Sequence, residues 1–230
     1  ENAKVIFLPT QAAADKDITE KILKSLDQGA KIIMTTGFMA KVNSGEKLAA
    51  LAQIKWPLAT TAITAQNVIS EGKEYTLKIP ISMDYQIIPD GANVLLQAAT
   101  PASDPFLVQN PNGNISILNT HTFSQKDFEA VGEVLLSPRP LGMLEFPRQW
   151  VNTIRAAFQS DGDPVVDAPA RVSVQQLTNG DCVIQNYNQE TVTVNIQRQH
   201  AGQLMDGLTG EPIKSVDDAI KLDMTPRSRL

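Results

Sequence analysis

The sequence has little of what catalytic and metal sites are usually built from. Its 230 residues include one cysteine, Cys182, and two histidines, His121 and His200. A single cysteine cannot form an internal disulfide or a cysteine-based metal site. Two histidines so far apart in the chain are also a poor basis for an ordinary zinc site. The composition therefore predicts no bound metal and no cofactor.

Long apolar runs and basic runs are missing as well. No stretch approaches the ~20 apolar residues that a membrane-spanning helix needs, and no charged start precedes an apolar segment as in a secretory signal. The net charge is -5, and no cluster of lysine and arginine offers a basic stripe. We therefore expect no membrane span and no nucleic-acid partner. Because the sequence starts at Glu1 rather than methionine, we expect a processed protein or a piece of a longer one.

Sequence motifs for nucleophilic catalysis and phosphate binding are absent too. There is no Gly-x-Ser-x-Gly turn, no Gly-x-Gly-x-x-Gly and no Walker-type loop. Gly180 and Cys182 supply half of a Gly-x-Cys-x-Gly pattern, but Ile184 stands where the last glycine would be. A hairpin turn at residues 179–180 explains Gly180 by itself. We therefore interpret Cys182 as a small buried hydrophobic residue.

The first half of the chain alternates strand and helix patterns. Residues 5–8 and 31–36 are apolar runs typical of strands covered on both faces. Between them, Asp17 and Glu20 suggest a reciprocal helix cap, and the following apolar residues share one helical face: Ile18, Ile22, Leu23 and Leu26. A strand–helix–strand unit of this length predicts a parallel strand pair.

Further elements follow with less regular spacing. Residues 55–113 contain short strand-like segments separated by glycine and proline, and residues 115–118 resemble a buried strand. A helix beginning near Pro147 should pack on the sheet through Val151, Ile154 and Phe158. The predicted elements are helices at 46–54, 123–136 and 147–158, and strands at 75–79, 85–88, 94–98 and 115–118.

The last part of the chain changes to a period of two. The polar segment 160–164 contains glycine and proline and predicts a domain boundary. After it, alternating apolar positions favour antiparallel strands: Val192, Val194 and Ile196, then Ile220, Leu222 and Met224. We predict an open α/β domain over residues 1–163, either complete or lacking N-terminal elements, and a small antiparallel β-sandwich over residues 164–230.

Three side chains remain as candidates for ligand contact. His121 follows the strand 115–118, and open α/β sheets place ligands at the carboxyl ends of their strands. Trp56 and Tyr187 could stack on sugar rings, although aromatic residues make up only 5% of the sequence. No pair of carboxylates stands out for acid–base chemistry, so we assign no catalytic residue.

The order of these features resembles a known arrangement. Residues 3–9 (AKVIFLP), a helix, and residues 28–37 (QGAKIIMTTG) are similar to the accessory domain of certain β-galactosidases. Residues 204–211 (LMDGLTGE) resemble part of the C-terminal β-sandwich of many glycoside hydrolases, and residues 115–120 (ISILNT) resemble the strand before the last helix of the accessory domain. The resemblance implies a flavodoxin- or amidotransferase-like α/β fold without the amidotransferase triad.

The resemblance also implies a role. The chain would be the non-catalytic C-terminal region of a glycoside hydrolase acting in carbohydrate metabolism. Its partners would be the catalytic domain of the same parent protein and other copies in a homo-oligomer, and the family favours a bacterial periplasmic or secreted location. Two alternatives remain open. One is a free-standing carbohydrate-binding module that uses Trp56 or Tyr187, and the other is a divergent amidotransferase-like hydrolase that uses His121.

Overall fold

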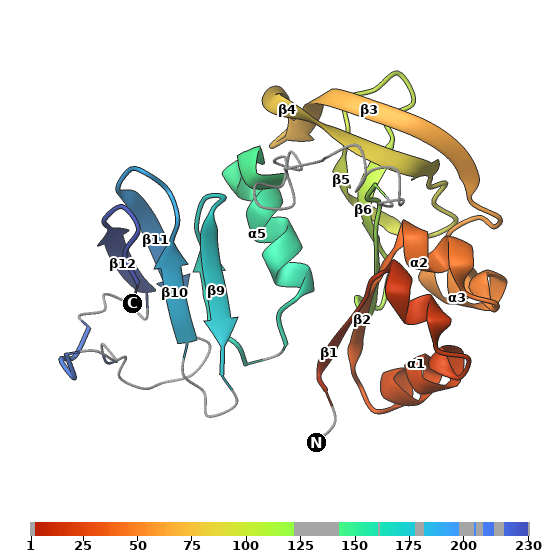
Figure 1. Cartoon of the computed structure of the whole chain (residues 1–230), viewed down its shortest axis with the longest axis horizontal. Coiled ribbons are helices and arrows are strands. Elements are labelled where there is room, and N and C mark those ends of the chain that lie inside the picture. The colour runs from red at the N-terminus through yellow and green to blue at the C-terminus, as the bar shows by residue number, and fades with distance from the viewer. Residues whose placement is uncertain are drawn as a thin grey trace, which may run out of the picture. The chain divides into compact units, whose positions relative to one another are not determined.

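The computed structural model describes residues 3–121, 143–160, 162–177, 182–197, 205, 209–213 and 219–229. Within these residues the chain is mixed α/β and forms two compact units, Glu1–Glu145 and Phe146–Leu230 (Figure 1). The predicted boundary after residue 163 falls inside the second unit. The predicted helix at 123–136 and the hairpin turn at 179–180 lie outside the described residues. No described helix has both the length and the apolar character needed to cross a membrane.

A five-stranded mixed sheet organises the first unit. Its order is β1 (Val5–Leu8), β2 (Lys31–Thr35), β7 (Ile115–Leu118), β6 (Pro105–Gln109) and β5 (Asn93–Gln97). β1, β2 and β7 run parallel, whereas β6 and β5 are added antiparallel. The predicted parallel pair is thus confirmed. The prediction that β1 is covered on both faces is wrong, because β1 is an edge strand and Phe7 remains 43% exposed.

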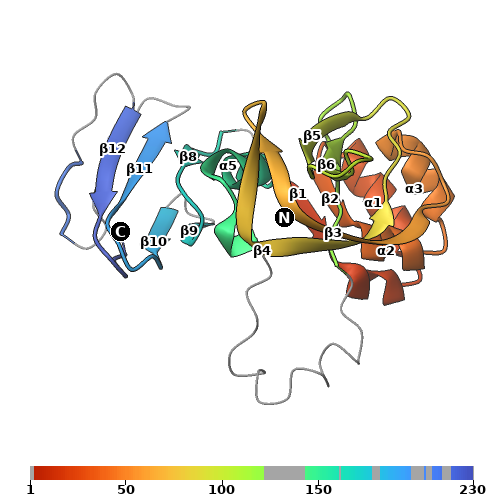
Figure 2. The same cartoon turned by 90° about the horizontal axis from the view of Figure 1, so that it is seen from above.

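The helices described in the first unit lie on one side of this sheet. They are α1 (Ile18–Asp27), α2 (Thr36–Lys41) and α3 (Gly45–Ala52), and both views place them together (Figures 1 and 2). Ile22, Phe38 and Leu48 project from them into one core. Alternate residues of the strands complete that core because neighbouring side chains of a strand point to opposite faces: Ile32, Met34, Val108, Ile115 and Ile117.

The start of α1 differs from the predicted reciprocal cap. Asp17 is the N-cap residue, but its side chain accepts no capping hydrogen bond. Asp15 takes that place in part, because its carboxylate accepts from the backbone N–H of Asp17 at 3.0 Å and pairs with Lys21. The helix end agrees with expectation, since Gly29 adopts φ +84°, a conformation that glycine reaches without strain.

A long β-hairpin occupies the region that was predicted as short strands. β3 (Ala59–Ser70) and β4 (Lys73–Gln86) pair antiparallel and make a separate two-stranded sheet in the first unit (Figure 2). Two register shifts bend the hairpin, between Thr60 and Ile63 and between Ala65 and Asn67. Most of its buried side chains fall on alternate positions, as expected for a ribbon with one covered face: Ile63, Ala65, Leu77, Ile81 and Met83. Val68 is buried as well and departs from the alternation after the register shift between Ala65 and Asn67.

The second unit combines one helix with two small antiparallel sheets. One sheet has the order β12 (Ala219–Met224), β11 (Val192–Gln197) and β8 (Val165–Asp167), and the other pairs β10 (Cys182–Asn186) with β9 (Val172–Gln176). The alternation predicted for residues 191–197 is confirmed, because Val192, Val194 and Ile196 are buried. Side chains from both sheets meet in a single core, in which Ile184 of β10 joins Ile220 of β12.

The helix predicted at 147–158 exists as α5 (Arg148–Ala157), and Pro147 is its N-cap residue. It belongs to the second unit, where it contacts β8. Its most buried side chains are Trp150 and Ala157, whereas Phe158 is 39% exposed. The predicted apolar face was therefore misplaced around the helix.

Polar contacts fix α5 to the strands of the second unit. Arg148 donates to Asp167 through both Nε and an Nη, at 2.5 and 2.9 Å, and Asn195 donates to the same carboxylate at 2.9 Å. The Arg148 hydrogen bond is the main reason why the pKa of Asp167 lies below its usual value. One carboxylate thus connects α5, β8 and β11.

The lowered pKa of Asp167 predicts a pH dependence for the second unit. A carboxyl group that is more acidic in the folded state stabilises the fold above its unfolded pKa of ~4 and loses this contribution as the pH falls through its folded pKa. We expect denaturant midpoints of the second unit to decline below pH ~4 more steeply in the wild type than in Asp167→Asn. Asp223→Asn, which removes a carboxyl group from β12, is the matched control. Parallel declines in wild type and Asp167→Asn would contradict the assignment.

Candidate functional site

An open pocket of about 600 Å³ lies at the carboxyl ends of the three parallel strands. Leu118 contributes from the end of β7, Thr35 from the end of β2, and Phe7 from β1. This is the edge at which α/β sheets place ligands, because the strand ends and the loops that follow them converge there. The remaining lining residues come from η1 (Thr10–Ala14), α2 and the segment after β7: Pro9, Thr10, Gln11, Ala13, Ala14, Lys41, Thr120 and His121.

Hydrogen bonds between strand ends fix this edge of the sheet. The Thr35 hydroxyl accepts from the backbone N–H of Phe38 at 3.1 Å and so caps α2. The Thr36 hydroxyl donates to Asn119 Oδ1 at 3.2 Å. Asn119 is fully buried and donates through Nδ2 to the carbonyls of Tyr85 at 2.8 Å and Pro105 at 3.1 Å. One amide side chain therefore connects the end of β7 to the start of α2 and to β4 and β6.

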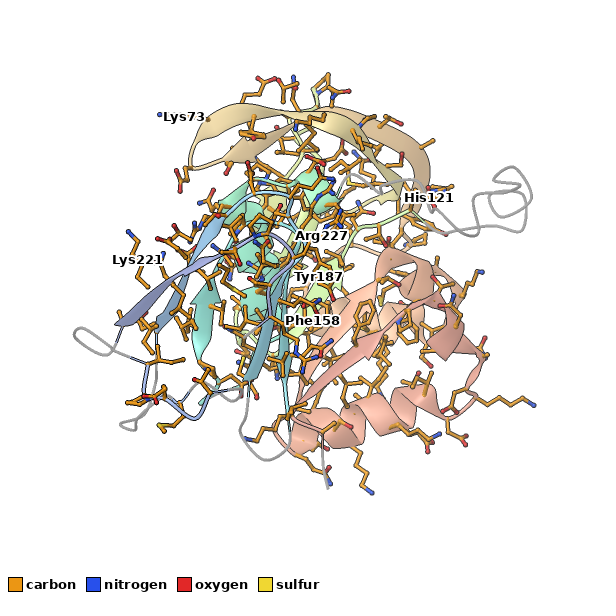
Figure 3. The ribbon with its side chains drawn as sticks, turned by 60° about the vertical axis from the view of Figure 1, so that its left-hand side comes forward. Lys73, His121, Phe158, Tyr187, Lys221 and Arg227 are labelled. Carbon is orange, nitrogen blue, oxygen red and sulfur yellow. The ribbon has the colours of Figure 1, made fainter. Side chains whose placement is uncertain are left out.

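His121 lies beside this junction, next to the end of the β3–β4 hairpin (Figure 3). Its Nδ1 is 2.8 Å from Asp84 Oδ1 on β4, and both side chains are partly exposed. A carboxylate at one ring nitrogen fixes the orientation of the imidazole. This pairing of His121 with an acid is one part of a catalytic arrangement, and the sequence alone did not predict it.

The described residues do not place an activated nucleophile with His121. The hydroxyl groups of Thr35 and Thr36 already bond to neighbouring elements. Cys182 lies in the second unit, and burial raises the pKa of its thiol, which disfavours the reactive thiolate. Among the described residues, no group of three or more His, Cys, Asp and Glu side chains is placed to hold a metal ion.

The two aromatic candidates lie in different surroundings. Trp56 is partly buried and packs against the core of the first unit. Its ring also covers Gly45, where an added Cβ would come within 2.5 Å of the indole. Tyr187, in the second unit, is 53% exposed and donates from its hydroxyl to Gln185 at 3.0 Å (Figure 3). Neither residue lines the pocket beside His121.

Sequence reasoning missed several residues of the pocket. Thr10, Gln11 and Lys41 were not predicted, although Thr10 and Gln11 directly follow Pro9 at the end of β1. The useful signal was the parallel β1–β2 pair, because polar residues that follow two parallel strands meet at the same edge. Lys41 had no such signal, since it lies on α2, a helix that the sequence did not predict.

Comparison with known proteins gives likeness only at the level of solved structures. No protein-family model matches the chain, and no curated protein matches it either. It is similar to α-L-fucosidase isoenzyme 2 from Paenibacillus thiaminolyticus, with 14% identity and a TM-score of 0.48 over 99% of this chain and 39% of that one. It is also similar to Gan42B, a GH42 β-galactosidase from G. stearothermophilus, with 14% identity and a TM-score of 0.43 over 98% of this chain and 31% of that one.

A third similar structure is PurLQS from Thermotoga maritima, with 17% identity and a TM-score of 0.37 over 57% of this chain and 80% of that one. The chain spans about a third of the length of the two glycoside hydrolases. At these identities and TM-scores, the likenesses assign no activity to the chain.

Proposed function

We propose that this chain is a non-catalytic accessory region of a glycoside-hydrolase-like protein and acts in carbohydrate metabolism. The amidotransferase-like interpretation of the α/β unit and the sandwich interpretation of the second unit belong to the same proposal. The sequence resemblance of residues 3–9, 28–37 and 204–211 supports it. In this proposal the chain contacts the catalytic domain of its parent protein and other copies of itself, and the chemistry takes place on that catalytic domain.

One observation carries the non-catalytic role. At the sheet edge where an α/β enzyme would place its nucleophile, Thr35 and Thr36 serve structural hydrogen bonds and Asn119 is fully buried between strand ends. A nucleophile has to be exposed and within reach of a base. Groups that hold α2, β4, β6 and the end of β7 together at this edge are not available for that role.

A second candidate function rests on the His121–Asp84 pair. A histidine oriented by a carboxylate can act as a general base once a substrate or water brings the group to be activated. In a pocket of about 600 Å³ this arrangement favours a divergent hydrolase over the carbohydrate-binding module. The binding module would need Trp56 or Tyr187 to offer a stacking face, and Trp56 is packed against the core.

The first experiment separates these two functions. The 230-residue protein is assayed with a panel of nitrophenyl glycosides and with glutamine, alongside His121→Ala and the matched variant His200→Ala. We expect all three proteins to show only the background rate of hydrolysis that is measured in buffer without protein. Turnover that His121→Ala abolishes and His200→Ala retains would instead establish the hydrolase.

The second experiment tests the accessory role directly. The product of the complete open reading frame is compared with a version that lacks residues 1–230 of this sequence. We expect glycoside hydrolysis by the complete product, and loss of its assembly or thermal stability when the region is removed. A complete product that contains no catalytic domain would overturn the proposal.

A further inference from the structure

We propose that the pocket at the carboxyl ends of β1, β2 and β7 binds a small hydroxylated carboxylate of sugar-acid size. This inference rests on the proposed non-catalytic function in one respect, namely that the ligand is held and not converted. A volume of about 600 Å³ is within the range of small-molecule sites.

Lys41 sets the charge of the pocket. Among the described lining residues it alone has a permanent charge, and none of them is an aspartate or glutamate. Lys41 is exposed at the end of α2, and it makes no ion pair or hydrogen bond with the residues that the structure describes. An ammonium group without a carboxylate of its own favours a ligand that brings one.

Uncommitted polar side chains lie around the same pocket. The Thr10 hydroxyl, the Gln11 amide and the Thr120 hydroxyl line it, and none of these side chains bonds to another described residue. Each can donate and accept hydrogen bonds. This combination suits hydroxyl groups, which also donate and accept, better than it suits a purely apolar acid.

An apolar wall completes the pocket. Phe7 on the edge strand β1 stays 43% exposed where it lines the pocket. Pro9 and Leu118 line the pocket as well. Such apolar surfaces contact the C–H groups of a sugar-like ring. The threonines and Gln11 provide hydrogen-bonding partners for its hydroxyl groups. The ligand thus needs one carboxylate, several hydroxyls and an apolar face.

The test uses two sugars that differ in one group. D-galacturonate carries a carboxylate where D-galactose carries a hydroxymethyl group. Binding is measured by titration calorimetry and ligand-observed NMR at constant ionic strength, for wild type, Lys41→Gln, Lys41→Arg and Lys24→Gln. Lys24 is an exposed lysine of α1 outside the pocket, so Lys24→Gln removes the same charge elsewhere. Circular dichroism spectra verify that each variant is folded.

We expect wild type to bind galacturonate more tightly than galactose, and Lys41→Gln to weaken galacturonate binding about tenfold, which is the weight of one charge-assisted hydrogen bond. Lys41→Arg should retain most of the affinity, and Lys24→Gln all of it. Equal binding of the two sugars, no binding of either, or an equal loss in Lys24→Gln would overturn the inference. Conversion of bound galacturonate, visible as new NMR signals, would instead overturn the proposed non-catalytic function.

Discussion

Replacing Arg155 by methionine is expected to destabilise the second unit by about 3 kcal/mol, because several acceptors lose their partner at once. The guanidinium donates to the carbonyls of Pro169 at 2.9 Å, Val172 at 2.7 Å and Ala168. Burial lowers the pKa of Arg155 to about 10. The carbonyl acceptors and the nearby Asp167 carboxylate stabilise this half-buried guanidinium cation. Methionine keeps the length of the side chain and removes every donor.

The measurement should resolve the two units. Hydrogen exchange followed by mass spectrometry reports the opening free energy for peptides of α5, β8 and β9 separately from those of the first unit. Lys221→Met is the matched control, because Lys221 is an exposed cation on β12 of the same unit (Figure 3). A change within ~0.5 kcal/mol is expected there. If Arg155→Met were equally mild, these hydrogen bonds would not stabilise the fold as argued.

The sequence allowed prediction of the elements whose pattern is local. β7 was predicted at residues 115–118 and β1 at residues 5–8, and both agree with the structure. Each is a mainly apolar run followed by a residue that is disfavoured in strands, Pro9 after β1 and Asn119 after β7. The same local logic failed for the helix cap at Asp17, because its side chain accepts no capping hydrogen bond and its backbone N–H donates to the Asp15 carboxylate, two residues earlier.

The β3–β4 hairpin could not be predicted from local pattern. Residues 59–62 read Ala-Thr-Thr-Ala and lack the apolar alternation of a half-buried strand. Pro80 stands within β4, where proline normally indicates a break. β6 begins at Pro105, a residue type that is uncommon in strands. These strands form because each pairs with the strand before or after it in the chain, and single-sequence patterns do not record such pairing.

The candidate site was predictable in place but not in composition. The carboxyl edge of the sheet was expected from the strand–helix–strand pattern, and His121 was a candidate because it follows the predicted strand 115–118. Asp84 did not, because it lies 37 positions from His121 on a strand that was not recognised at its true length. The orientation of His121 by Asp84 therefore depends on the position of the hairpin. Asn119 holds the hairpin there through its hydrogen bond to the Tyr85 carbonyl.

Replacing Asn119 by alanine is expected to destabilise the first unit by about 3 kcal/mol. Asn119 is fully buried, and without its amide the carbonyls of Tyr85 and Pro105 lose their donor in a site that water does not reach. Thr36→Val removes just one hydroxyl from the same junction and should cost about 1 kcal/mol. Denaturant unfolding compares both with Asn112→Ala, an exposed asparagine in the turn before β7, for which a change within ~0.5 kcal/mol is expected.

The same variant tests whether the junction positions the His121–Asp84 pair. Asp84 directly precedes Tyr85, whose carbonyl Asn119 holds, and His121 follows Asn119 by two residues. Loss of the amide should therefore loosen both sides of the pair. The chain has two histidines. In an NMR spectrum of the imidazole signals, His121 therefore reports on the pair and His200 serves as an internal reference. We expect the His121 resonance to shift in Asn119→Ala while the His200 resonance and both resonances of Asn112→Ala stay unchanged. An unchanged His121 signal in a destabilised protein would mean that Asn119 stabilises the sheet edge without orienting the histidine.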